Sequence, residues 1–303
     1  MSERFFNEEF LQRLERIALV ARRATAGQTQ GERRSRKRGQ SVEFADFRPY
    51  VAGDDFRRID WNAYARLERF FIKLFVEEED LTVHFLIDTS RSMRFGEPQK
   101  LEYALRAVGA LGYMGLSGLD RITVTAVGNG KAHGNGSYFP PHRGKQQALT
   151  FFSFLQGLEG SPTADISGNR PNPGRALQAY AASAARLGPL VLFSDLMDDG
   201  WQEGLRVLAG RGFEVTVVHT LSSEEAQPSL EGDFKLLDAE DGGGVEITAD
   251  YELLARYRKG LADWQEGLRR FCAARQINYV AVLSTLPLDE LLFTWLRLKG
   301  VLR

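Results

Sequence analysis

The sequence predicts an α/β protein with a mostly parallel β-sheet and helices on both of its faces. From residue 81 onward, apolar runs rich in β-branched residues alternate with amphipathic stretches of helical periodicity. The apolar runs are also continuous instead of alternating with polar residues. Continuous runs are typical of parallel strands that are buried on both faces.

The predicted elements follow one another regularly between residues 81 and 221. The predicted strands are 81–90, 121–128, 189–195 and 213–221, with a short extended piece around 137–141. The predicted helices are 98–117, 145–158, 174–187 and 201–212.

Beyond residue 221 the simple alternation is interrupted. Glycines 242 to 244 can supply the positive φ of a tight turn, which predicts an inserted hairpin near 233–249. A helix over 250–275, a buried strand over 277–285 and a helix over 287–300 are expected to follow. One domain is therefore placed at 81–303.

Residues 1–80 are predicted to form an N-terminal helix, a basic loop and an accessory subdomain. The helix over 7–24 has one apolar face, and its charges exclude a secretory signal. Five of the six residues from Arg33 to Arg38 are basic. No aromatic residue interleaves them as a stacking platform would require, so a solvated loop is favoured over a nucleic-acid site.

The segment 41–80 packs aromatic residues between charges and includes a predicted strand around 69–76. We interpret the motif GDDFRRIDW within it as structural, with aspartates paired to arginines around a buried Trp61. A second partner surface or an acidic metal site is the alternative.

Composition limits the classes of function. The chain has 303 residues with 43% hydrophobic and 26% charged residues, and its formal net charge of -1 favours neither nucleic acid nor a membrane surface as partner. No run approaches the roughly 20 apolar residues of a membrane span. Cys272 is the single cysteine, which fits a reducing compartment. A soluble cytoplasmic protein is expected.

Oxygen-bearing side chains gather at the ends of two predicted strands. Asp88, Ser90 and Ser92 follow the first strand of the sheet, and Asp195 ends a later one. In open α/β sheets, ligands bind beyond the carboxyl ends of the strands. A carboxylate and two hydroxyls suit Mg²⁺ or Mn²⁺, and the two aspartates are expected to face the same crevice and the solvent. Helix capping is the alternative role for Asp88.

The run DTSRS followed by Met93 is similar to the D-x-S-x-S motif of the metal-ion-dependent adhesion site in von Willebrand factor A domains. More widely, RGQSVEFADFRPYVAGDDFRRIDWNAYAR, NYVAVLST and PLDELL resemble the bacterial family called domain of unknown function 58. The resemblance implies a von Willebrand factor A-like fold in a non-enzymatic, chaperone-like partner protein. It also implies a MoxR-type AAA+ ATPase as partner, acting in assembly or maturation of client proteins.

One position departs from the adhesion-site pattern. The threonine that such sites draw from the loop before the helix at 174–187 corresponds to about Pro171, which has no side-chain oxygen. Asn172 or a water could substitute. Metal binding by the chain alone is therefore predicted to be weak, also because Arg91 adds an opposing charge.

Four residues near this site are predicted to contact the partner: Arg91, Arg94, Asn172 and Asp198. For the two arginines, contact with a partner carboxylate and simple solvation both remain open. Capping of the helix near Trp201 is the simpler role of Asp198.

Signatures of catalysis are sparse in the sequence. There is no P-loop motif, no G-x-S-x-G elbow and no dinucleotide-binding loop. The rival function is a metal-dependent phosphohydrolase using Asp88, Asp195 and perhaps Asp198. Its chemistry needs an acid two residues after the first aspartate, where this chain has Ser90. A closed pocket would favour that rival, and an open rim would favour adhesion. His84, inside an apolar strand, is expected to be a core residue.

Overall fold

The computed structural model describes residues 12, 43–51, 56, 59–76, 82–127, 138–160, 173–198, 200–239 and 242–292. The helix predicted at 7–24, the basic loop Arg33 to Arg38, Pro171, Asn172 and most of the helix predicted at 287–300 lie outside these residues. The chain divides into two compact units, Thr29–Asp80 and a larger one of Met1–Gln28 with Leu81–Arg303.

A six-stranded sheet forms the centre of the larger unit. Its strands are β3 (Thr82–Asp88), β4 (Arg121–Val127), β5 (Tyr138–Arg143), β6 (Pro189–Ser194), β7 (Glu214–Leu221) and β10 (Asn278–Leu283). They lie in the order β10-β7-β6-β3-β4-β5, and all neighbours are parallel except β4 and β5. The predicted mostly parallel sheet of a von Willebrand factor A-like fold is confirmed.

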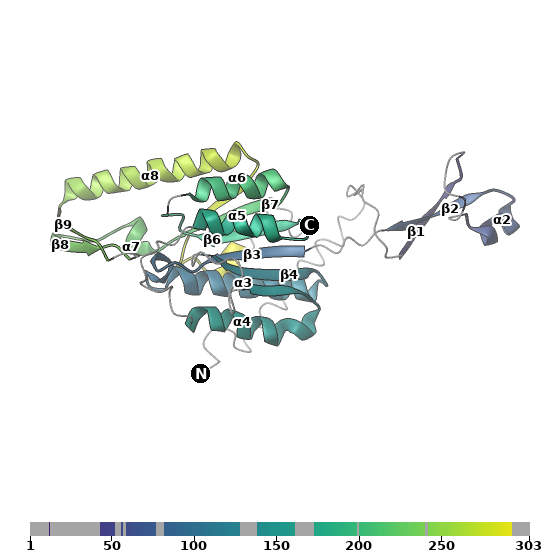
Figure 1. Ribbon diagram of the computed structural model, residues 1–303, viewed down its shortest axis with the longest axis horizontal. Helices are drawn as coiled ribbons and strands as arrows, with labels where there is room; N and C mark the ends of the chain where they lie inside the picture. The colour runs from purple at the N-terminus through teal and green to yellow at the C-terminus, as the bar shows by residue number, and fades with distance from the viewer. Residues whose placement is uncertain are drawn as a thin grey trace. The chain divides into compact units, whose positions relative to one another are not determined.

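Helices cover both faces of this sheet (Figure 1). On one face lie α3 (Lys100–Ser117) and α4 (Ala148–Gly160), which share a core cluster with Phe85 and Ile87 of β3. On the other lie α5 (Pro173–Ser183), α6 (Trp201–Arg211) and α8 (Tyr251–Ala273), which pack with Leu86. The alternation along β3 thus builds two hydrophobic layers. No helix in the described ranges is long and apolar enough to cross a membrane.

The inserted hairpin predicted near 233–249 is confirmed. It consists of β8 (Gly232–Leu237) and β9 (Gly244–Ala249), paired antiparallel. Gly242 has φ +74 at the turn, as the glycine run predicts. Asp250 then caps α8, because its carboxylate accepts a hydrogen bond from the backbone N–H of Leu253 at 2.7 Å.

The smaller unit contains β1 (Glu43–Pro49), α2 (Trp61–Leu67) and β2 (Phe71–Val76), with the two strands antiparallel. The prediction of a buried Trp61 is wrong, because this side chain is 60% exposed. Asp60 is used locally as the N-cap of α2 and accepts from the backbone N–H groups of Asn62 and Ala63. Trp61 directly follows this N-cap and is the first residue of α2. None of the residues of this short helix is buried.

His84 is a core residue, as predicted. The residue is 3% exposed, and its Nδ1 lies 2.6 Å from the hydroxyl of Tyr180. Burial lowers the pKa of His84 to about 4. Between pH 6.5 and 4, His84 is therefore protonated in the unfolded chain but stays neutral in the folded chain. Stability from this group is fully present above pH 6.5 and is lost as the pH falls towards 4.

We expect His84→Gln to reduce this acid sensitivity. From pH 7.5 to pH 5, the wild type should lose about 2 kcal/mol more free energy of unfolding than the variant. Burial also lowers the pKa of His219 to about 4, so His219 destabilises both proteins as the pH falls. Asp88, whose pKa is raised, has the opposite effect on the stability of both proteins. Urea unfolding at the two pH values measures the difference, and equal losses would contradict the assignment.

Candidate functional site

The carboxyl ends of β3 and β6 form the centre of the candidate site. These two strands are neighbours at the middle of the sheet, and the strand order runs outward from them in both directions. Such a topological switch point opens a crevice where ligands bind in α/β folds. Asp88 ends β3 and Asp195 directly follows β6, so the strand-end placement predicted for both aspartates is what the structure has.

Asp88 accepts hydrogen bonds from two residues, Ser90 and Ser194. Its Oδ1 accepts from the backbone N–H of Ser90 at 3.0 Å, and its Oδ2 accepts from Ser194 Oγ at 2.5 Å. The expectation that Asp88 faces solvent is wrong, because the residue is only 2% exposed. Burial, and then the negative charge of Asp195, raise the pKa of Asp88 to about 7.

The hydroxyls after β3 form hydrogen bonds within the loop and with the end of β4. Ser90 Oγ and Ser92 Oγ lie 3.1 Å apart, and Thr89 Oγ1 donates to the carbonyl of Val127 at the end of β4. Ser92 begins a short 3-10 turn, Ser92–Arg94. We refer to Asp88, Ser90, Ser92, Ser194 and Asp195 as the switch-point site.

A buried lysine completes this site, and the sequence did not reveal it. Lys100 begins α3, is 0% exposed, and donates from Nζ to Asp195 Oδ2 at 2.8 Å. The same ammonium is paired with Oε1 of Glu225. Glu225 lies in α7 (Ser223–Ala226), a short helix after β7 with a capping box between Ser222 and Glu225. The S-x-x-E spacing is the signal that could have predicted α7.

The predicted partner-contact residues differ in their surroundings. Arg94 donates from Nη1 to the carbonyl of Glu159 in α4, so part of its guanidinium links two elements. Arg91 is the N-cap of the 3-10 turn and is partly exposed. Asp198 is partly exposed in the loop after β6. Asn172 lies outside the described residues.

These residues, as arranged, do not fit a bound divalent cation. Asp195, one of the two predicted carboxylate ligands, lies against the ammonium of Lys100, so a cation bound there would meet a like charge. In the part of the chain that the structure describes, no group of three or more His, Cys, Asp or Glu residues is placed to hold a metal ion. Binding of Mg²⁺ or Mn²⁺ in the presence of a partner stays a prediction.

A groove adjoins the switch-point site, and we call it the β6–α8 groove. It has a volume of about 880 Å³ and lies between the loop after β6 and one side of α8. Its lining consists of Leu196, Met197, Asp198, Trp201, Gln202, Tyr257, Gly260, Leu261, Trp264, Gly267, Leu268 and Phe271. Leu196 directly follows Asp195, so the groove and the acidic site share one loop. The lining is mainly apolar and aromatic.

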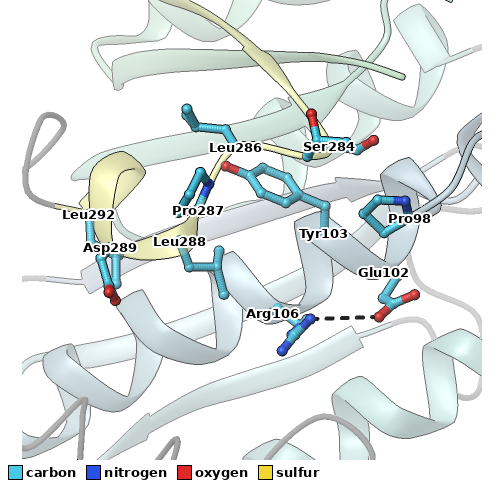
Figure 2. A pocket seen from close by; sticks show the side chains of 11 residues that line it. Pro98, Glu102, Tyr103, Arg106, Ser284, Leu286, Pro287, Leu288, Asp289 and Leu292 are labelled. Atoms are coloured by element: carbon cyan, nitrogen blue, oxygen red, sulfur yellow. Dashed lines mark ion pairs between the residues drawn. The ribbon is translucent and has the colours of Figure 1, made fainter. Parts of the chain in front are cut away.

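A second pocket, of about 380 Å³, lies between α3 and the segment that follows β10 (Figure 2). Pro98, Leu286 and Leu288 are among its apolar walls, and an ion pair between Glu102 and Arg106 lies at one side (Figure 2). The hydroxyl of Tyr103 and that of Ser284 are buried there without a hydrogen-bond partner among the described residues. Burial, and then the charge of Glu290, raise the pKa of Tyr103, so this hydroxyl stays neutral.

Comparison with known proteins shows that most of the chain matches one family. The family model described as "Protein of unknown function DUF58" matches residues 46–267. The uncharacterized protein Mb1516 of Mycobacterium bovis is 26% identical over 252 residues, which are 82% of this chain and 77% of that protein.

Two solved structures are similar to parts of the chain. The conserved hypothetical protein BatB from Bacteroides thetaiotaomicron is 20% identical, with a TM-score of 0.42, and the match covers 67% of this chain and 90% of that one. A von Willebrand factor type A protein from Catenulispora acidiphila is 15% identical, with a TM-score of 0.33. The match covers 50% of this chain and 35% of that protein's chain.

Proposed function

Because this chain belongs to the family Protein of unknown function DUF58, we propose that it is a non-enzymatic protein that binds another protein through the β6–α8 groove. The family resemblance supports a MoxR-type AAA+ ATPase as the partner, acting in assembly or maturation of a client. The single cysteine, Cys272, is free and buried, which supports a cytoplasmic location.

The lining of the groove is the observation that carries this proposal. Trp264, Phe271 and Tyr257 gather there with Met197, which is 46% exposed, beside Trp201, which is buried in the core. Aromatic residues and methionine are enriched in the centres of protein interfaces, and their apolar area drives association. Gly260 and Gly267 of α8 leave open space where a Cβ would be, so a partner segment can approach the helix backbone.

The polar groups beside the groove support binding over catalysis. A phosphohydrolase would need a free carboxylate as nucleophile and a second acid to protonate the leaving group. Asp195 is paired with Lys100, and Asp88 is held by Ser194 and Ser90. The position two residues after Asp88 is Ser90, which cannot protonate a leaving group at neutral pH.

We expect Met197→Glu to abolish recovery of the partner. A carboxylate at this half-exposed position would have to be buried in an apolar interface without a counter-ion, which is strongly unfavourable. Co-purification of a MoxR-type ATPase from native lysate measures the effect. Leu149→Glu is the matched control, because Leu149 is 79% exposed and lies on α4, which covers the other face of the sheet. Equal recovery with both variants would refute the groove as the binding surface.

A further inference from the structure

We propose that Lys100 supplies from within the chain the positive charge that a bound metal supplies in adhesion-type sites. In this view Lys100 holds Asp195 of the switch-point site and Glu225 of α7 together without a divalent cation. The inference concerns the site next to the proposed binding groove, but it rests on the geometry around the lysine and is tested on the protein alone.

The lysine joins three elements that end at the same edge of the sheet. Lys100 begins α3, Asp195 follows β6, and Glu225 lies in α7 after β7. The ammonium contacts a carboxylate from each of the other two elements. It therefore holds the loops after three neighbouring strands of the crevice to one another, as a metal ion does when its ligands come from several loops.

The burial of the lysine distinguishes this pair from an ordinary surface ion pair. Both side chains of the Lys100–Asp195 pair are nearly inaccessible, at 0% and 2%, and that of Glu225 is 13% exposed. Lysine is almost never fully buried unless it is paired. A buried ammonium is stable only where acceptors compensate its lost hydration, and two carboxylates provide them here.

The same ammonium opposes a metal at the site. A divalent cation that used Asp195 as a ligand would lie within a few ångströms of a like charge that the fold has fixed in place. The lysine is therefore a more direct reason to expect weak metal binding than is the single missing ligand near Pro171.

The test is to remove the internal cation and look for a new dependence on metal. Purified wild type, Lys100→Met and Arg106→Met are melted in EDTA, in MgCl₂ and in MnCl₂. The wild type should melt at the same temperature in all three. Lys100→Met should melt about 10 °C lower in EDTA, because two carboxylates lose their buried partner. It should recover part of that loss in MgCl₂ or MnCl₂, since the freed carboxylates can now bind a cation.

Arg106→Met is the control, because it removes one positive charge from the same helix. Its ion pair with Glu102 is long and exposed, so neither the melting temperature nor the response to metal should change much. Calorimetric titration of the wild type with MnCl₂ is the second measurement, which decides the matter if Lys100→Met does not fold in any buffer. Saturable one-site binding by the wild type would overturn the proposal. So would a folded Lys100→Met that melts identically in EDTA and MnCl₂.

Discussion

Gly174→Ala is expected to lower the free energy of unfolding by about 3 kcal/mol. Gly174 lies at the start of α5, where a Cβ would come within 2.1 Å of the carbonyl oxygen of Gly200. That neighbour is backbone just before α6, with φ +90, so it cannot move aside as a flexible side chain does. The two helices must separate or the loop after β6 must shift.

The matched control is Gly210→Ala in α6. No atom lies within 4 Å of the Cβ position at Gly210, so the substitution meets open space. Alanine is the better helix former by about 1 kcal/mol, and this variant should be at least as stable as the wild type. Urea unfolding of both variants measures the contrast. Similar urea midpoints for the two variants would contradict the prediction, because they would show that α5 and the loop before α6 can move apart at little cost in stability.

The strands of the sheet were predictable because burial on both faces leaves an unbroken apolar pattern. The predicted strand 189–195 corresponds to β6, Pro189–Ser194, and the predicted 121–128 to β4, Arg121–Val127. Trp61 was mispredicted because the sequence around it has no such pattern. Large aromatic residues are usually buried, and a single short helix gives no periodicity with which to assign its faces.

The candidate site was predictable only in part. Asp88 and Asp195 were predictable because the ends of neighbouring parallel strands meet at one edge of the sheet. Lys100 was not, since a lysine at the start of an amphipathic helix is usually solvated and nothing local marks it as buried. Its partners are 95 and 125 residues away in the chain. Only the tertiary fold brings these charges together.

Asp88→Ala and Asp88→Asn are expected to differ in stability. Alanine leaves the buried N–H of Ser90 and the hydroxyl of Ser194 without their acceptor, at a cost of about 2 kcal/mol. A solvent-facing aspartate would cost little stability when replaced by alanine, but Asp88 is only 2% exposed. Asparagine retains an acceptor for Ser90. Its amide can donate to Ser194 Oγ, which also accepts from the backbone N–H of Leu196. The melting temperature of Asp88→Asn should therefore stay close to that of the wild type.

Recovery of the partner separates two roles for this carboxylate. A residue that is 2% exposed cannot meet a partner directly, so we expect Asp88 to act by holding the loop from Thr89 to Ser92 and the end of β6 in place. Asp88→Asn keeps the bond from the Ser90 N–H and replaces the bond from Ser194 with one in the reverse direction. It should recover as much partner as the wild type, whereas Asp88→Ala should recover less in proportion to its lost stability. If Asp88→Asn melts normally but recovers no partner, the charge itself is required. The switch-point site would then have to open on binding and present that carboxylate to a cation.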